Sequence, residues 1–140
     1  KAYPTPKPRK TLPVKSSRML ILLNQQGEVM LQQRPPTGIW GGLWSFPELP
    51  EDAEVIAWCD QQLAMQVEQI DQGELLRHTF SHFHLDIQPL YLRARPQPNR
   101  IMESSEIVWY NTQLTDQRGV AAPIERLLSQ IPPSIRERGI

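Results

Sequence analysis

Apolar residues gather in short runs along the first part of the chain, separated by turn-forming residues. Residues 19–23 form an unbroken apolar run, residues 24–27 have the composition of a turn, and residues 28–33 form a second, more mixed run. A short unbroken apolar run is typical of a strand buried on both faces, and an Asn-Gln-Gln-Gly segment favours a chain reversal. The pattern therefore predicts a β-hairpin over residues 19–33.

Two later segments place apolar residues at helical spacing. Pro50 and Asp52 open a segment that we expect to be helical to about residue 65, with acidic residues in its first turn. A second helix is predicted over residues 123–131, with a proline in its first turn. The predicted buried faces consist of Ile56, Cys59 and Leu63 in the first helix, and of Ile124, Leu127, Leu128 and Ile131 in the second.

The region between these helices has the pattern of β-structure. Residues 74–80 and 83–92 are predicted to form two strands, and Pro89 predicts an edge position or a bulge because proline cannot donate to a strand ladder. A polar loop is expected over residues 95–103 and a further strand over residues 107–110. Mixed strands with two helices favour an α+β fold, with mixed β-sheets flanked by helices.

The length of 140 residues is enough for one domain with its own core. We expect this domain at residues 18–132. Residues 1–17 are rich in Pro and Lys, and alternate prolines favour an extended chain, so they are predicted to be a basic interdomain connector of a longer protein. Residues 133–140 contain too few apolar residues to predict an element and are treated as a C-terminal tail.

The net charge is zero, but the charges are unevenly distributed. The first 18 residues contain basic and no acidic side chains, so the rest of the chain is acidic overall. A basic, proline-rich arm can follow a phosphate backbone through charge alone, while a solvated linker is an equally favoured alternative. The side chains predicted to contact the DNA backbone are Lys7, Arg9, Lys10 and Lys15.

The chain has a single cysteine, Cys59. One cysteine excludes a disulfide framework and favours a reducing, cytoplasmic setting. No apolar run approaches the roughly 18 residues that a membrane-spanning helix needs, so no membrane contact is expected.

Residues 34–48 form a segment rich in Trp, Gly and Pro, whose composition favours a rigid loop. Gly42 and Glu48 stand at the G-x5-E spacing that opens a Nudix box, the motif with which Nudix hydrolases hold metal ions against a diphosphate. The acidic second half of that box is absent from residues 56–64, where only Asp60 offers a carboxylate. Mg²⁺ needs several oxygen ligands, and hydrolysis needs a group that activates water. We therefore predict a degenerate Nudix box without a metal site.

Several segments together resemble a known family. In chain order they are Thr-Leu-Pro at 11–13, Gln-Arg-Pro-Pro-Thr-Gly-Ile-Trp-Gly-Gly-Leu-Trp-Ser-Phe-Pro at 33–47, Arg-His-Thr-Phe-Ser-His-Phe-His at 77–84, Trp-Tyr-Asn at 109–111 and Ala-Ala-Pro-Ile-Glu-Arg-Leu-Leu at 121–128. They closely resemble the C-terminal domain of bacterial adenine DNA glycosylases of the MutY family. The resemblance implies a Nudix-like fold related to MutT and recognition of 8-oxoguanine opposite adenine in DNA base excision repair.

The resemblance also assigns roles to residues. Phe80, Ser81 and His82 match the loop that probes the oxidised base, with Ser81 as the main contact. Adenine excision, a helix-hairpin-helix and a 4Fe-4S cluster belong to the N-terminal glycosylase domain of the family, so no catalytic residue and no cofactor are expected in this segment. The implied partners are that domain and double-stranded DNA with an 8-oxoguanine:adenine mispair. A monomer associated with the nucleoid is expected.

The chemistry at this loop agrees with such a role. Guanine presents N7 as an acceptor in the major groove, and oxidation turns this position into an N–H donor beside a new O8 carbonyl. The Ser81 hydroxyl can accept from that N–H, and a neighbouring backbone amide can donate to O8. Without the resemblance, an ordinary hairpin turn with a buried Phe80 is the favoured interpretation.

The histidines suggest a metal site as an alternative. His78, His82 and His84 have the same parity on an extended strand, and Asp86 continues the row, so a zinc site is conceivable. A turn at Ser81 would break the common face, and histidines at a nucleic-acid-facing edge explain the row more simply.

Two other functions remain open. An active Nudix hydrolase of oxidised nucleotides would need carboxylates that the first helix lacks. A protein-docking module would be favoured by exposure of Trp40 and Trp44, and burial of both rings would argue against it.

Overall fold

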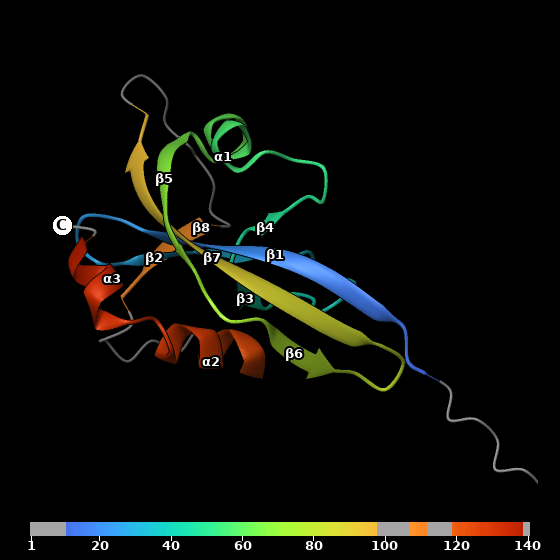
Figure 1. Ribbon diagram of the computed structural model, residues 1–140. Helices are drawn as coiled ribbons and strands as arrows, with labels where there is room; N and C mark the ends of the chain where they lie inside the picture. Colours follow the sequence, from blue (N-terminus) through green and yellow to red (C-terminus); the bar gives the residue numbers. More distant parts are fainter. Residues whose placement is uncertain (1–10, 98–106, 112–118, 139–140) are drawn as a thin grey trace, which may run out of the picture.

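A computed structural model describes residues 11–97, 107–111 and 119–138 of the chain (Figure 1). These residues form an eight-stranded mixed sheet with the main strand order β3-β2-β1-β7-β5. Three further strands join it at its margins: β4 pairs with β1, β6 with β7 and β8 with β2. The elements are β1 (Val14–Leu23), β2 (Val29–Gln33), β3 (Trp44–Ser45), β4 (Glu48–Leu49), α1 (Val55–Leu63), β5 (Met65–Gln72), β6 (Leu76–Thr79), β7 (His84–Pro96), β8 (Ile107–Tyr110), α2 (Ala122–Ser129) and α3 (Pro133–Arg138).

The centre of the sheet is a pair of long parallel strands, β1 and β7, which lie side by side along the molecule (Figure 1). Their register runs from Val14 opposite His84 to Leu23 opposite Arg93. The predicted hairpin is confirmed, since β1 turns back into β2 with Leu23 opposite Val29. Strand β1 begins before the expected start of the domain at residue 18, so residues 14–17 belong to the sheet.

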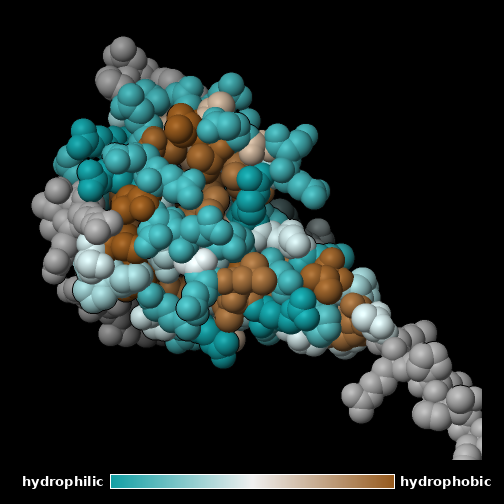
Figure 2. Space-filling model, viewed as in Figure 1, coloured by the Kyte–Doolittle hydropathy of each residue, from teal (hydrophilic) through white to brown (hydrophobic). Residues whose placement is uncertain are grey.

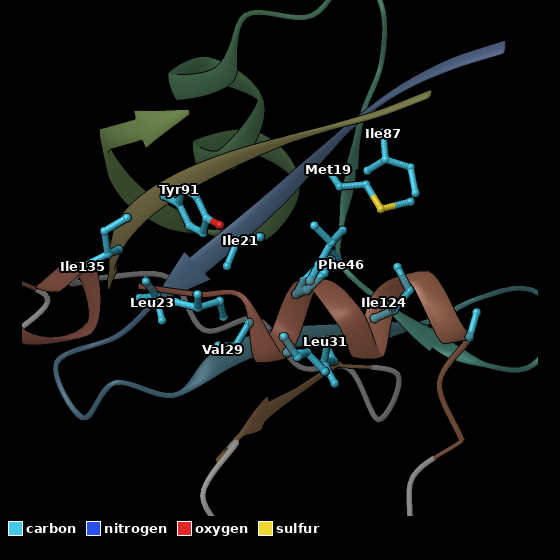
Figure 3. Close-up of a cluster of buried hydrophobic side chains, with 14 of the residues drawn as sticks. Met19, Ile21, Leu23, Val29, Leu31, Phe46, Ile87, Tyr91, Ile124 and Ile135 are labelled. Atoms are coloured by element: carbon cyan, nitrogen blue, oxygen red, sulfur yellow. The ribbon is translucent and has the colours of Figure 1, made fainter. Parts of the chain in front are cut away.

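Apolar side chains of β1 serve two cores, one on each face of the sheet. Met19, Ile21 and Leu23 face the larger core, which α2 and α3 cover (Figure 3). Leu20 and Leu22 face the second core, which lies under α1. Successive side chains of a strand point to opposite faces. Helices on both sides therefore require the unbroken apolar run, and the α+β class with helices flanking a mixed sheet is confirmed.

Helix α1 is shorter than predicted, and one residue of its expected apolar face is wrong. Cys59 and Leu63 are buried, but Ile56 is 54% exposed, so the buried face begins after the first turn. The expected acidic first turn is also wrong, because the acidic residues precede the helix. Glu54 is instead the N-cap, and the helix ends at Ala64, whose backbone is left-handed with φ 53°.

Strand β5 was not predicted. It forms an edge of the sheet, antiparallel to β7, with a register shift between Gln69 and Asp71. This irregularity interrupts the apolar alternation of Met65, Val67 and Ile70, so the period of two that reveals a strand is lost.

Of the two expectations for Pro89, the edge position is wrong, because β7 lies inside the sheet, between β1 and the strands β5 and β6. Pro89 stands where the antiparallel partner of β7 changes: Leu76 of β6 is opposite Ile87, and Gln72 of β5 is opposite Leu90. A proline nitrogen at this interruption removes no ladder hydrogen bond. Strand β7 also continues through Pro96, beyond the expected start of the polar loop at residue 95; the part of that loop from residue 98 lies outside the described residues.

The C-terminal part follows the helical pattern. The four apolar residues predicted for the second helix are all buried, namely Ile124, Leu127, Leu128 and Ile131. Helix α2 ends at Ser129, before the predicted residue 131, so Ile131 is buried in the segment that follows it. The segment expected to be a tail contains α3, and its Ile135 is 3% exposed within the larger core. The predicted strand at residues 107–110 is confirmed as β8. In the described part of the chain, no helix has the length and apolar character that crossing a membrane requires.

Candidate nucleic-acid interface

The predicted recognition loop is the turn between β6 and β7. The last ladder pair joins Thr79 and His84, and beyond it the Phe80 N–H donates to the Phe83 carbonyl oxygen at 2.8 Å. Ser81 and His82 form the tip of this turn and are both exposed, whereas Phe80 is half-buried. We call residues 80–83 the tip turn. It presents one hydroxyl, one imidazole and backbone amides to solvent at one end of the sheet.

An aromatic cluster lies beneath the tip turn. The Phe80 ring stacks on Phe83 with centroids 4.6 Å apart and meets the edge of His78 at 4.7 Å. Trp40, from the loop before β3, lies 5.8 Å from Phe80 and 6.0 Å from His78. Offset and edge-to-face arrangements at these distances are favourable for aromatic pairs. We call Trp40, His78, Phe80 and Phe83 the aromatic stack. Phe80 is therefore part of a packed cluster, and the exposed groups are those of Ser81 and His82.

Sequence reasoning missed the contribution of Trp40 and His78 to this site. His78 and Phe80 alternate along the strand, which places them on one face, and that was the available signal. Nothing in the local pattern joins Trp40 to them, because the contact depends on how the loop after β2 folds back.

A cation lies beside the tip turn. The Lys15 ammonium is 4.5 Å from the centroid of the Phe83 ring, a cation–π geometry. The entering chain is held at the same place, since the His84 N–H donates to the Pro13 carbonyl oxygen at 2.9 Å. Of the side chains predicted to contact the DNA backbone, the structure thus places Lys15 next to the tip turn. Lys7, Arg9 and Lys10 lie outside the described residues.

The three histidines face different surroundings. Cross-strand pairs share a face, so His78 lies with Leu85 on the core side, and His84 lies with Thr79 on the opposite side. The His84 Nδ1 is 2.8 Å from the Thr79 hydroxyl. Within the described ranges, no group of three or more His, Cys, Asp or Glu side chains is arranged to hold a metal ion. The alternative of a histidine-rich zinc site has no support in this geometry.

On the face of His84, Arg77 and Asp86 form a bidentate ion pair. The Arg77 Nε and Nη2 donate to the two Asp86 carboxylate oxygens at 2.6 and 3.0 Å. These hydrogen bonds lower the pKa of Asp86 and raise the pKa of Arg77. The pair is part of the β6–β7 ladder, two residues from its end, and it fixes the register of the hairpin that carries the tip turn.

The loop that carries Trp40 is closed by its own backbone. The Gly42 N–H donates to the Pro35 oxygen at 2.9 Å, and the Arg34 Nε donates to the Ile39 oxygen at 2.7 Å. Trp40 has a left-handed backbone with φ 53°, a conformation that non-glycine residues rarely adopt. The composition predicted this rigid loop, and residues 44–45 and 48–49 of the same segment form the short strands β3 and β4.

Trp40 and Trp44 are both half-buried and pack against the larger core. In the described ranges, the large hydrophobic side chains that are exposed come from three separate parts of the chain, namely Val14, Ile56 and Leu75. Hydrophobic residues likewise form separate patches on the face shown in Figure 2. This arrangement disfavours a docking surface built on the two tryptophans.

We call residues 34–43, between β2 and β3, the tryptophan loop. The region of the degenerate Nudix box is a cleft of about 630 Å³ between this loop and α1. Among the residues that the structure describes, Glu48 is the only acidic one that lines it. Its carboxylate is engaged: Oε2 accepts from the Ser17 hydroxyl at 2.8 Å, and Oε1 lies 3.6 Å from Arg34 Nη1. Asp60 does not line the cleft and accepts from Gln97 Nε2 at 2.6 Å. The described lining of this cleft therefore offers one carboxylate to a metal-bound diphosphate.

The sheet with one helix between the glycine-rich loop and β5 is a known arrangement. A family model described as a NUDIX domain matches residues 18–130. The chain belongs to the NUDIX domain family. The MutT NUDIX hydrolase of Burkholderia pseudomallei has a similar fold, with a TM-score of 0.61 at 13% identity over 85% of this chain and 98% of that one. The Nudix-like fold expected from the sequence is confirmed.

Two relatives of this chain are named adenine DNA glycosylase, the family that its sequence motifs resemble. The chain is 26% identical over 133 residues to the adenine DNA glycosylase of Buchnera aphidicola subsp. Acyrthosiphon pisum, covering 95% of this chain and 37% of the relative. It is 22% identical over 125 residues to that of Buchnera aphidicola subsp. Baizongia pistaciae, covering 89% and 35%. The chain thus spans little more than a third of the length of these relatives. The similarity to adenine DNA glycosylases is confirmed.

Proposed function

We propose that this chain is the 8-oxoguanine recognition domain of an adenine DNA glycosylase. It discriminates 8-oxoguanine:adenine mispairs, while adenine is excised by a catalytic domain outside these 140 residues. The observation that carries the proposal is the tip turn, which exposes Ser81 and His82 on a fixed aromatic base beside a lysine. The relatives named adenine DNA glycosylase support the same assignment.

The tip turn offers the groups that the oxidised base requires. The Ser81 hydroxyl accepts from the N7–H of 8-oxoguanine, and a backbone amide of the turn donates to O8. Unmodified guanine has neither group, since its N7 is an acceptor and its C8 carries no oxygen. His82 lies at the same exposed tip and flanks the base.

The cations around the tip turn suit contacts to the phosphate backbone. Lys15 lies beside the turn, and Pro13 is hydrogen-bonded to His84 at its base. Lys7, Arg9 and Lys10 precede this segment in the sequence, and we assign them to phosphate contacts as well. Phosphate contacts of this kind position a protein on the duplex, and the base contacts of the turn specify the lesion.

The remaining assignments follow from the same proposal. The 4Fe-4S cluster that the resemblance implies is assigned to the catalytic domain of the longer chain, since such clusters are held by several cysteine thiolates and this chain has one cysteine. The domain acts in that chain as a monomer on nucleoid DNA in the cytoplasm.

The direct test measures adenine release under single-turnover conditions by the longer glycosylase chain. Substrates carry either 8-oxoguanine or guanine opposite adenine. The Ser81→Ala variant is expected to lower the ratio of the two rate constants by a factor corresponding to about 1–3 kcal/mol. The matched control is Ser134→Ala, which removes an exposed serine hydroxyl on α3. An equal ratio in the Ser81→Ala variant and the wild type would refute the proposal.

The 140-residue chain permits a second measurement. In an NMR titration with the two duplexes, the amide signals of residues 80–83 are expected to shift with 8-oxoguanine:adenine DNA. Smaller shifts are expected with the guanine:adenine duplex. Shifts confined to other parts of the domain would place the DNA contact elsewhere.

A further inference from the structure

Trp40 holds an unfavourable backbone conformation while its side chain contacts the aromatic stack. A left-handed backbone at a residue other than glycine is costly and persists where the surroundings enforce it. Here the Leu43 N–H donates to the Trp40 oxygen at 3.0 Å, and the loop is closed further by the hydrogen bond from Arg34 to Ile39. The indole is thereby fixed in position before it meets His78 and Phe80.

The stack connects this fixed indole to the exposed tip. Trp40 contacts both His78 and Phe80, Phe80 stacks on Phe83, and Lys15 lies over Phe83. Both residues that flank Ser81 and His82 therefore have their rings in the stack. Strand β6, which leads into the turn, is short and lies at the margin of the sheet, where it pairs with β7 (Figure 1).

We propose that Trp40 and His78 are positioning residues for the recognition of 8-oxoguanine. They hold the Phe80 ring so that the Ser81 hydroxyl and the tip amides keep one arrangement before DNA binds. This inference rests on the proposed function of the tip turn. A preorganised site avoids the cost of ordering its groups on binding. The oxidised base differs from guanine by one donor, N7–H, and one acceptor, O8, and only protein groups that are held in place distinguish such a small difference.

The loss of these contacts has an effect specific to the lesion. A loosened tip turn still approaches either duplex, and the phosphate contacts of Lys15 and the arm are unchanged. The hydrogen bonds to N7–H and O8 exist only with the oxidised base, so only that substrate loses binding when the turn is mobile. A purely structural role would instead lower the rate on both duplexes together.

The first experiment measures amide hydrogen exchange in the 140-residue chain. Its readout is the Phe80 N–H, which closes the tip turn. Trp40→Gly removes the indole at a position whose φ suits glycine, and His78→Val removes the imidazole while keeping a strand-forming residue. Each variant removes one aromatic contact to Phe80 together with the contact between Trp40 and His78, so each is expected to speed Phe80 exchange by about twofold to tenfold. Trp40→Phe keeps a ring in the stack and should restore most of the protection.

The matched control is Trp58→Ala, which removes a half-buried tryptophan that packs against the second core. Phe80 exchange should be unchanged in this variant. Unchanged exchange in Trp40→Gly and His78→Val as well would overturn the inference.

The second experiment uses the longer glycosylase chain with both duplexes. Trp40→Gly and His78→Val are expected to lower the ratio of rate constants for 8-oxoguanine over guanine, and Trp40→Phe to retain it. If Ser81→Ala lowers the ratio and these two variants do not, the positioning role fails and the proposed function stands. An equal loss on both duplexes also overturns the positioning role. If Ser81→Ala leaves the ratio unchanged, the proposed function itself fails.

Discussion

A Cβ atom added to Gly41 would lie 2.5 Å from the backbone oxygen of Pro36. The tryptophan loop turns back on itself here, as the bond from the Gly42 N–H to the Pro35 oxygen shows. Since the obstacle is backbone, no side-chain rotation relieves it. Gly41→Ala is therefore expected to destabilise the domain by about 1–3 kcal/mol, the usual cost of overpacking, as measured by urea unfolding.

Gly119 provides the control for this prediction. Of the described atoms, a Cβ there would meet the terminal Cδ2 of Leu43 alone, at 3.2 Å, and that side chain can move by a few tenths of an ångström. Gly119→Ala should cost much less than Gly41→Ala. Equal effects of the two substitutions would show that close backbone approach does not limit the loop.

Helix α1 depends on a carboxylate at its start. The Glu54 side chain accepts from the Ala57 N–H at 2.8 Å and from the Ile56 N–H at 3.1 Å, and these hydrogen bonds lower the pKa of Glu54. A lowered pKa in the folded state gives stability that is present above the ordinary pKa and lost as pH falls through the folded value. Glu54→Ala should therefore lower the melting temperature at neutral pH, and its difference from wild type should shrink in acid.

The control for the cap is Glu51→Ala, at an exposed glutamate before the helix. This variant should melt close to the wild type at neutral pH. A Glu54→Ala deficit that stays constant down to acid pH would contradict a charge-dependent cap.

The thiol of Cys59 is fully buried, and burial, with a smaller contribution from the Glu54 charge, raises its pKa to about 12. The native thiol is therefore protonated at pH 8 and out of reach of reagents that attack the thiolate. We expect reaction with a disulfide reagent to follow the rate of unfolding in native buffer and to be fast in urea. Fast reaction of the native protein would contradict this burial.

The pKa of Cys59 also has a consequence for stability in alkali. The folded state holds this proton more tightly than the unfolded chain, so the contribution is complete below the ordinary pKa of 9.0 and is lost as pH rises toward about 12. The stability difference between the wild type and Cys59→Ala should accordingly shrink over this range.

The elements that the sequence predicted correctly are those whose buried residues follow a regular spacing along the chain. Residues 19–23 are apolar at every position because both faces of β1 are covered, and the face of α2 keeps its spacing over two turns. Strand β5 escaped prediction because it is a polar edge strand with an irregular register. The predicted edge position of Pro89 was wrong because a proline at an interruption between two partner strands has the same sequence pattern as a proline in an edge strand.

The candidate site was predictable only in part. The exposed tip at Ser81 and His82 follows from the turn between two strands, but the support beneath it does not. Trp40 reaches His78 and Phe80 from a loop far away in sequence, and no local pattern encodes such a contact. The same limit applies to Asp60, which accepts a hydrogen bond from Gln97 and does not line the cleft.

The cleft at the degenerate Nudix box makes a prediction about hydrolysis. Glu48, the one acidic residue in the described part of its lining, interacts with Ser17 and Arg34. We expect no Mg²⁺-dependent release of pyrophosphate from 8-oxo-dGTP by the 140-residue chain, with an active MutT hydrolase as the positive control. Release that disappears in a Glu48→Gln variant would establish a hydrolase activity and revive that alternative.

The basic arm is expected to supply most of the salt-dependent DNA affinity of the isolated domain. Residues 1–10 carry Lys1, Lys7, Arg9 and Lys10, and their removal leaves the sheet intact because β1 begins at Val14. Each neutralised phosphate contributes about 0.9 to the slope of log affinity against log salt. Deleting residues 1–10 should therefore weaken binding to any duplex and flatten that slope by up to about 4. Lys15→Ala, which removes a single cation, should flatten it by about 1. If the deletion leaves affinity and slope unchanged, the arm is a solvated linker and the DNA contacts lie in the folded domain alone.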